Sequence, residues 1–539
     1  MNDNTDSLVA SSGSVDLGNT PNTIVIFPYS GDYRVDVLLA GGTNKWFPDL
    51  VAGQSRTVTY SFALSAGYLN EETYSEEKKG FTPFTAAEKS AARAIFEYIG
   101  SILQMSFVEV TETSSASSPT GDIRLANNDQ DSAGYAFYPD NMDSQLRGDV
   151  FLSNGVTGRD YAAGTYEYDT VIHEIAHALG LKHPGNYNAG SAPSSESGNY
   201  LATSEDSKII SVVSYAEHEQ GLQRVDFGPY DLLALKYLYG LKSQNTGNNT
   251  YEWADSIGMQ LQTLVDDGGT DIIDLRKITT PTTVDLREGQ SSSAGLIRHV
   301  GNGSGVDALR NIQIAFGTII ESVVCSAQTD QIIGNAANNA FQGRGGDDVL
   351  NGGDGRDTAI WSGSSDQYKI STTSQGFAVQ SLKSAEGTDQ LQNIERLQFS
   401  DGAIALDLNG NAGMTAKILG AVFGKLAVTN KQFVGIGLNY LDDQGYSYIS
   451  LMGLAISVVL GANPTSAQVV DLLYTNVVGV APDAATRKSF TDLLDNGTFT
   501  VASLGVLAAD TDLNKANINL VGLAQTGLEY LPFNNFSVV

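Results

Sequence analysis

Apolar and polar positions follow three different patterns along the chain. From about residue 23 to 243, some segments have the apolar spacing of helices and others the alternation of strands, which predicts a mixed α/β region. The expected strands are 58–64, 107–113, 123–126, 135–138 and 149–152, and the expected helices are 85–105, 166–179 and 228–239. Gly180 is expected to end the helix 166–179, and Pro229 stands at the first position of the helix 228–239.

Beyond residue 243 the pattern changes twice. Between about 244 and 405, short apolar runs are separated by Gly, Asp and Asn, which is typical of a β-solenoid or a β-sandwich. From about 406 helical spacing returns, and helices are expected over 416–426, 432–441, 447–460, 466–475 and 482–496. The polar residues 1–22 are interpreted as a disordered leader or a short propeptide. The expected domains are therefore 23–243, 244–405 and a small all-α domain over 406–539.

The charge balance excludes some classes of partner. Lys and Arg total 31 against 61 Asp and Glu, a formal net charge of −30. A field of this sign repels nucleic acid and anionic membranes, and it attracts cations such as Ca²⁺, whose preferred ligand is carboxylate oxygen. Taken alone, however, an acidic surface that keeps the protein soluble explains the balance better than a calcium site does.

Cysteine content and the N-terminus bear on the compartment. Cys325 is the single cysteine, so no intrachain disulfide can form. This fits a reducing compartment, and it fits equally a secreted protein that metal ions stabilise. Residues 1–20 lack the basic and apolar parts of a Sec signal peptide. The longest apolar run, 449–460, is too short to span a bilayer, so we expect no transmembrane segment.

The sequence HEIAHALGLKH carries the clearest chemistry. His173 and His177 lie four residues apart on one helix face, and Gly180 permits a turn that brings His183 back as a third ligand. Three neutral imidazoles suit one catalytic Zn²⁺, and Glu174 is placed to act as a general base. HExxH alone also occurs by chance on helices, but the extended pattern is far more restrictive. The other two histidines, His218 and His299, are expected to have no metal role.

The stretch HEIAHALGLKHPGNYNAG, residues 173–190, carries the metzincin signature and resembles the serralysin family of zinc proteases almost residue for residue. Further similarities lie at 211–215, where the family has its Met-turn followed by Tyr, and at 231–240. The resemblance covers about residues 23–405. It implies an α+β metzincin catalytic domain followed by a parallel β-roll or β-sandwich domain.

The resemblance also implies a role for Tyr215. In the family this residue is a further zinc ligand that swings away to stabilise the oxyanion. Spacing alone favours a simpler interpretation, a buried ring with a bonded hydroxyl. Val213 stands where the family has methionine, and it is shorter, stiffer and without sulfur. We expect a looser floor under the site and weaker zinc retention, with activity kept.

The segment Gly134, Tyr135, Ala136 and Phe137 precedes the active helix, as the metzincin edge strand does. An extended substrate can add to such an edge through backbone hydrogen bonds. An ordinary strand with no substrate contact explains the segment equally well.

Residues 325–360 align at a period of nine. The sixth position of each repeat is Asp or Asn and the eighth is apolar, which resembles the RTX nonapeptide GGxGxDxUx. The residues expected to bind several structural Ca²⁺ ions are Asp330, Asn339, Gly343, Gly346, Asp348, Gly352, Gly353, Gly355 and Asp357. In the roll that this implies, two repeats make one coil, so Asp330 stacks with Asp348 and Asn339 with Asp357. Cys325 and Ser326 replace two glycines, so we expect a short roll with about two to four sites. A Gly/Asn-rich loop that binds no ion is the alternative.

A roll that folds only when calcium is present suits export of an unfolded chain, and the resemblance implies a type I secretion apparatus. The ending Phe536-Ser537-Val538-Val539 resembles that of serralysins, without the acidic residue that precedes it there. Residues 406–539 resemble a helical domain of unknown function in calcium-repeat exoproteins. For this domain, secretion, surface attachment and capping of the roll stay open.

The sequence thus predicts a secreted, monomeric zinc endopeptidase whose partners are protein substrates, a proteinaceous inhibitor and the secretion apparatus. A second hypothesis is a surface- or S-layer-associated calcium-binding adhesion protein with a vestigial protease domain. The long C-terminal addition and Val213 motivate this second hypothesis. The intact Glu174 argues against it.

Overall fold

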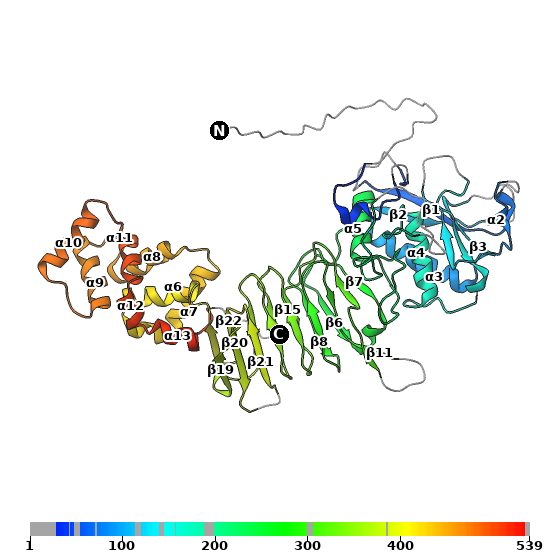
Figure 1. The fold of residues 1–539 in the computed structure, drawn as a ribbon. Helices are drawn as coiled ribbons and strands as arrows, with labels where there is room; N and C mark the ends of the chain where they lie inside the picture. Colours follow the sequence, from blue (N-terminus) through cyan, green and yellow to red (C-terminus); the bar gives the residue numbers. More distant parts are fainter. Residues whose placement is uncertain are drawn as a thin grey trace, which may run out of the picture.

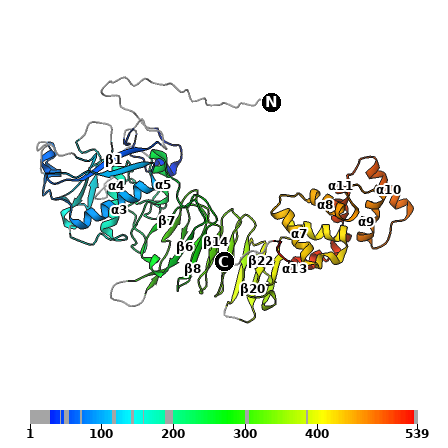
Figure 2. The same cartoon turned by 180° about the vertical axis from the view of Figure 1, so that it is seen from behind.

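The computed structural model describes residues 28–41, 44–47, 54–69, 73–113, 120–139, 145–156, 158–187, 199–298, 305–383 and 386–533. The predicted leader, His299 and the ending 536–539 lie outside these residues. The described chain is elongated, with a mixed α/β region at one end, stacked strands in the middle and helices at the other end (Figures 1 and 2).

The N-terminal region is built on a five-stranded sheet of order β2-β1-β3-β5-β4. Its strands are β1 (Arg56–Phe62), β2 (Met105–Glu109), β3 (Ile123–Asn128), β4 (Gly134–Ala136) and β5 (Val150–Ser153). All neighbours are parallel except β4, which pairs antiparallel with β5 and ends the sheet. The five predicted strands are therefore present, with boundaries shifted by a few residues.

Three long helices accompany this sheet. They are α3 (Ala86–Ile102), α4 (Tyr166–Ala178) and α5 (Pro229–Tyr239), and short helices α1 (Tyr33–Asp36) and α2 (Ser75–Lys78) were not predicted. Thr85 caps α3 in a capping box with Glu88, and Thr165 caps α4. Because α3 ends at Ile102, Met105 is free to begin β2, so the predicted helix 85–105 was too long by one turn. The apolar faces of the three helices and the sheet share one buried core.

The middle of the chain winds into a coil with two sheets, whose central strands are parallel and whose ends include antiparallel pairs. One sheet has the order β24-β23-β22-β18-β16-β14-β8-β6 and the other the order β19-β20-β21-β17-β15-β9. The strands of the coil that the nonapeptides form are β15 (Gln331–Ile333), β16 (Ala340–Gln342), β17 (Val349–Asn351) and β18 (Thr358–Ile360). β15 pairs with β17 and β16 with β18, which confirms the predicted stacking of alternate repeats. The apolar eighth positions, Ile332, Phe341, Leu350 and Ala359, are fully buried between the sheets.

Further strands extend the coil in both directions. Before it lie β6 (Thr250–Ala254), β7 (Gln262–Leu264), β8 (Ile272–Lys277), β9 (Thr283–Asp285), β10 (Ser291–Ser292), β11 (Leu296–Ile297), β12 (Val306–Asp307), β13 (Ile312–Ile314) and β14 (Ser322–Val324). Of these, β7, β10 and β13 form a separate three-stranded sheet, and β11 and β12 form a two-stranded one. After it lie β19 (Tyr368–Thr372), β20 (Phe377–Ser381), β21 (Thr388–Gln392), β22 (Arg396–Phe399) and β23 (Gly402–Ala405). β19 and β20 form an antiparallel insertion, after which β21 and β22 resume the parallel stacking.

The C-terminal region is helical, with α6 (Asn411–Ile418), α7 (Lys431–Asp442), α8 (Tyr448–Leu460), α9 (Ser466–Val478), α10 (Ala484–Asp495), α11 (Val501–Ala509), α12 (Asp512–Asn517) and α13 (Leu520–Thr526). The predicted helix 416–426 is instead the end of α6, a π-helical turn, Leu419–Phe423, and a 3₁₀ turn. Gly420 lies in the π turn, where a Cβ would approach Ile518 within 2.5 Å, so the widened turn accompanies a close helix contact. The region also contains one strand, β24 (Leu528–Tyr530), which returns to pair with β23.

None of the helices within the described ranges combines the length and the apolar character that a membrane crossing requires.

Candidate metal centre

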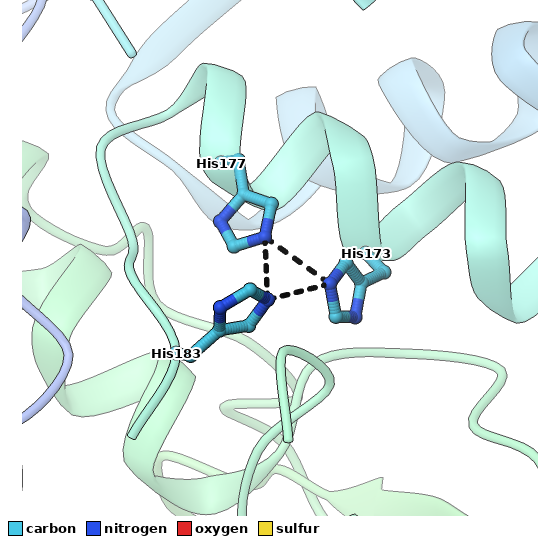
Figure 3. A group of neighbouring side chains, drawn as sticks. All are labelled: His173, His177 and His183. Carbon is cyan, nitrogen blue, oxygen red and sulfur yellow. Dashed lines mark hydrogen bonds between the residues drawn. The ribbon is translucent and has the colours of Figure 1, made fainter. Parts of the chain in front are cut away.

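Three histidines converge at the end of α4 (Figure 3). His173 and His177 are one helical turn apart, and Gly180 ends the helix with a φ of 96°. A Cβ at Gly180 would lie 2.3 Å from the Asn44 carbonyl oxygen, so only glycine fits this turn. The chain then returns His183, and its Nε2 lies 3.3 Å from His173 Nε2 and 3.2 Å from His177 Nε2. The His173 and His177 Nε2 atoms are 3.1 Å apart.

Backbone carbonyls orient two of these rings. His173 Nδ1 lies 3.0 Å from the Val212 oxygen, and His177 Nδ1 lies 2.6 Å from the Leu181 oxygen. Because a carbonyl only accepts, each Nδ1 carries the proton and each Nε2 presents a lone pair to the centre. Burial, followed by the neighbouring histidines, lowers the pKa of His173 well below its ordinary value, and burial lowers the pKa of His177 to about 4.

This arrangement fits a zinc ion. Facing lone pairs repel one another unless a cation lies between them. Zinc–nitrogen bonds of about 2.0–2.1 Å in a tetrahedron place the nitrogens about 3.3–3.4 Å apart, close to the separations of 3.1–3.3 Å found here. Within the described part of the chain, no other three His, Cys, Asp or Glu side chains converge in this way. His218 lies elsewhere, bonded through Nε2 to the Leu309 carbonyl.

Glu174 is buried beside the cluster, and its Oε2 has no hydrogen-bond partner within the described residues. Burial raises the pKa of this carboxyl to about 8. Strand β4 packs against it, since a Cβ on Gly134 would lie 2.8 Å from Glu174 Cγ. A carboxyl with a free oxygen and a pKa near neutrality is suited to moving protons.

A turn over residues 211–213 supports His173, and Asp231 of α5 holds this turn. The Asp231 carboxylate accepts hydrogen bonds from Ser211 Oγ (2.6 Å) and from the backbone N–H groups of Val212 (2.7 Å) and Gly228 (2.8 Å). Val212 in turn offers its carbonyl to His173. Val213 is fully buried in the same turn. The sequence analysis missed the role of Asp231, although its position two residues after Pro229 signals a helix N-terminus.

Tyr215 lies beside the imidazoles. Its ring centroid is 4.4 Å from that of His183 and 5.6 Å from that of His173, with which it is nearly parallel. The side chain remains 44% exposed, more than the simpler interpretation of a buried ring expects. Burial, followed by the charge of Glu174, raises the pKa of Tyr215 to about 12.

The segment Gly134–Phe137 lies at the free edge of the sheet, next to Glu174. The Tyr135 ring stacks on Phe151 and its hydroxyl accepts a hydrogen bond of 2.7 Å from Asn128 Nδ2. Phe137 contacts the edge of the Phe151 ring. The two aromatic side chains are therefore held by packing, while the strand has no neighbour among the described residues on its outer side.

The polar sixth positions of the nonapeptides form two buried ladders. The backbone N–H of Asp330 donates to Asp348 Oδ1 (2.8 Å), and that of Asn339 donates to Asp357 Oδ1 (2.7 Å). Oδ2 of Asp348 and Oδ2 of Asp357 have no partner within the described residues. Burial and the neighbouring acids raise the pKa of Asp348 to about 8 and that of Asp357 to about 7.

The predicted glycines make room for these carboxylates. A Cβ on Gly343 would lie 2.6 Å from Asp348 Oδ2, and one on Gly352 would lie 2.2 Å from Asp357 Oδ2. Three others have left-handed backbones, Gly346 (φ 111°), Gly353 (φ 94°) and Gly355 (φ 118°).

Both ladders continue beyond the repeats that the sequence analysis identified. The N–H of Asp348 donates to Asp389 Oδ1 (3.1 Å), and the N–H of Asp357 donates to Glu395 Oε2 (2.8 Å). These partners are 41 and 38 residues apart, because the β19–β20 insertion interrupts the period. For Asp389, the signal that a search for a nine-residue period missed is Gly-Thr-Asp at the start of a strand, found at 387–389 and again at 269–271.

Comparison with known proteins finds several relatives that are named serralysin, whereas no family model matches the chain. It is 26% identical over 350 residues to Serralysin G of Dickeya chrysanthemi, covering 61% of this chain and 68% of that protein. It is 30% identical over 335 residues to Serralysin of Proteus mirabilis, covering 56% of this chain and 64% of that protein. It is 30% identical over 329 residues to Serralysin C of Dickeya chrysanthemi, with coverage of 56% and 64%. The chain thus spans about two thirds of the length of these relatives.

Proposed function

We propose that this homologue of the serralysin metalloproteases is a secreted zinc endopeptidase that hydrolyses peptide bonds in proteins. The observation that carries the proposal is the convergence of three Nε2 atoms within 3.3 Å of one another beside the buried, unpartnered carboxyl oxygen of Glu174. His173, His177 and His183 are the proposed zinc ligands. Relatives named serralysin and metalloprotease support the same chemistry.

When bound, zinc polarises a peptide carbonyl and lowers the pKa of water. Glu174 accepts the proton of the attacking water on its free oxygen and passes it to the leaving amine. Its pKa of about 8 keeps both protonation states within reach near neutral pH. Tyr215, beside His173 and His183, is the proposed further ligand, and its phenol group stabilises the oxyanion that develops on the substrate.

The edge of β4 is the proposed substrate strand. An extended peptide would pair with Gly134–Phe137 through backbone hydrogen bonds, while the side chains of Tyr135 and Phe137 stay packed on Phe151. Backbone pairing depends little on side chains, so we propose broad sequence tolerance. Gly134 also lets Glu174 lie directly behind this strand.

At finer detail, we propose that residues 23–243 form a metzincin catalytic domain, 244–405 an RTX β-roll and 406–539 a helical domain that serves secretion or surface attachment. Buried, stacked carboxylates with free oxygens support Ca²⁺ binding along the roll. We further propose that the roll folds only when calcium is present, which would suit export of the unfolded chain by a type I apparatus and action outside the cell.

Casein digestion tests the proposal. Glu174→Gln keeps the shape of the side chain and removes its ability to take a proton, so casein clearing should fall by about 10²–10⁴-fold with zinc retained. Glu167→Gln, on the same helix but near its N-terminus, is the matched control and should clear casein like the wild type. Equal clearing by wild type and Glu174→Gln, or none by either, would rule out the proposal, and none by either would favour a calcium-binding surface protein with a vestigial protease domain.

A further inference from the structure

We infer that Tyr187, together with Asp206, is a positioning residue that holds Tyr215 against the metal ligands. The inference rests on the proposed function in one respect, that Tyr215 acts at the metal. Tyr187 lies in the stretch 173–190 but beyond the three histidines, Asp206 lies outside that stretch, and the sequence analysis assigned no role to either.

Tyr187 contacts Tyr215 in two ways. Its hydroxyl accepts a hydrogen bond of 3.0 Å from the backbone N–H of Tyr215. The two rings also stack, with centroids 5.0 Å apart and planes 16° apart. On another side, the Tyr187 ring lies 5.6 Å from that of His183, so one aromatic ring contacts both the third histidine and Tyr215.

Asp206 holds Ser214, the residue that precedes Tyr215. Its carboxylate lies close to the Tyr187 ring, since a Cβ on Gly185 would contact both, and it accepts a bond of 2.6 Å from Ser214 Oγ. Ser214 Oγ in turn accepts a bond of 3.0 Å from the N–H of Ala216. Tyr187 therefore holds the backbone at Tyr215, and Asp206, which is only 8% exposed, holds Ser214 and through it the N–H of Ala216.

The loop after His183 is shaped for this contact. A Cβ on Gly185 would lie 2.1 Å from Tyr187 Cε1 and 2.5 Å from Asp206 Oδ2, so a side chain there would push both residues away. The absence of a side chain at Gly185 thus leaves room for the Tyr187 hydroxyl to accept from the N–H of Tyr215.

The exposure of Tyr215 bears on how Tyr187 acts. Tyr215 is 44% exposed, whereas its backbone N–H is held by Tyr187. A phenol that approaches and leaves the metal needs such a fixed pivot, because a small displacement of its Cα changes where the oxygen arrives. Removing the Tyr187 hydroxyl should loosen the pivot and leave the three histidines in place.

The test compares Tyr187→Phe with Tyr98→Phe in the full-length protein. Tyr98 is the matched control because its buried hydroxyl also accepts a backbone N–H, that of Phe227 at 3.2 Å, away from the histidine cluster. Each protein is reconstituted separately with Zn²⁺ for casein kinetics and with Cu²⁺ for the phenolate-to-copper absorption band. That band reports the position of Tyr215 whether or not the protein cuts casein.

We expect Tyr187→Phe to lower kcat by about three- to tenfold with KM and zinc content unchanged, as loss of one hydrogen bond implies. The copper band should weaken in the same variant, and Tyr98→Phe should match the wild type in both measurements. A copper band in Tyr187→Phe equal to that of the wild type, or no phenolate band in the wild type at all, would overturn the inference. An inactive wild type with a normal band would instead overturn the proposed peptidase function alone.

Discussion

Two buried acids near the candidate metal centre, Glu174 and Asp231, differ in their hydrogen bonding. Asp231 accepts three hydrogen bonds, whereas Glu174 Oε2 has no partner among the described residues. Burial raises both pKa values, but the hydrogen bonds hold that of Asp231 at about 6 while that of Glu174 reaches about 8. Asp231 is therefore committed to holding the turn, and Glu174 remains free for proton transfer.

Asp231→Ala should weaken zinc binding without touching a ligand. The change leaves Ser211 Oγ and two backbone N–H groups without their acceptor, so the carbonyl of Val212 no longer holds His173 in place. We expect zinc affinity to fall about 10–100-fold and stability by about 3 kcal/mol. Asp226→Ala is the control, since it removes a nearby, largely buried acid that bonds Arg224 and Thr263 instead. Competition with a chromogenic chelator measures the affinity, and equal affinity for the two variants would contradict this role.

Val213→Met should slow the loss of zinc. Val213 is fully buried in the turn whose carbonyl orients His173, and methionine would fill more space there with a polarisable sulfur. We expect zinc release to a chelator to slow severalfold and the melting temperature to rise. Val212→Met, the same change one residue earlier, should give no such gain. If zinc release and the melting temperature are unchanged in Val213→Met, valine at this position does not weaken zinc retention.

At the scale of single residues, the zinc ligands could be predicted from the sequence, but the residues that orient them could not. The spacing of His173, His177 and His183 is enough to predict convergence, because helix geometry and one glycine turn determine it. Asp231 and Tyr187 act from 58 and 14 positions beyond His173, and nothing in local spacing links a side chain to a turn that only the folded chain brings near.

Among the elements, the coil differs most from an ordinary packed sheet, because its two ladders stack buried acids. Asp330, Asp348 and Asp389 follow one another along one sheet, and Asn339, Asp357 and Glu395 along the other. A period of nine residues predicted the first members of each ladder. The later members were missed because the β19–β20 insertion breaks the period while the spatial stacking continues.

The calcium-free coil should lose stability as pH rises. The folded pKa values are about 8 for Asp348 and about 7 for Asp357 and Asp389, against an ordinary value of 3.8. Because these pKa values are raised, the protonated carboxyls contribute stability that is complete below about pH 4 and is lost as pH rises to about 8. In the presence of a chelator, the melting temperature at pH 8 should therefore lie below that at pH 5.

With calcium present, the melting temperature at pH 8 should instead lie above that at pH 5, because the charged carboxylates bind the ion and the protonated ones do not. Asp348→Asn should flatten the pH dependence in the chelator, because the residue with the highest of the three pKa values no longer titrates. Melting followed by circular dichroism measures both effects. A calcium-free protein that melts higher at pH 8 than at pH 5 would contradict the assignment.

On the scale of the whole molecule, buried arginines join the three regions. Arg224, fully buried in the N-terminal region, donates to Gln313 Oε1 of β13 (3.2 Å) and to Thr263 Oγ1 of β7 (2.5 Å). Arg396 of β22 is only 4% exposed at its side chain and pairs with Asp407 and with Asp442 of α7. The elongated arrangement in Figure 1 is thus held by specific polar contacts at each junction.

The junction with the helical region has two independent attachments. Asp442 accepts from Arg396 (2.8 Å) and pairs with Arg356, which precedes β18, at 3.1 Å. Strand β24 returns from the helices to extend the coil's sheet by pairing with β23. The last turn of the coil, which ends in β22 and β23, should therefore unfold together with the helical region, although helical spacing alone predicted a separate all-α domain.

Asp442→Ala tests this coupling. It leaves the buried Arg396 with one acidic partner and removes an acceptor from Asn411, so we expect a loss of about 3 kcal/mol at the junction. More calcium should then be needed to fold the last coil, and protease cleavage should begin near residues 406–411. Lys431→Ala is the control, because it breaks an exposed pair with Glu529 at the same end of the coil and should change little. If limited proteolysis across a calcium titration gives the same midpoint for Asp442→Ala and the wild type, the helical region folds independently of the coil.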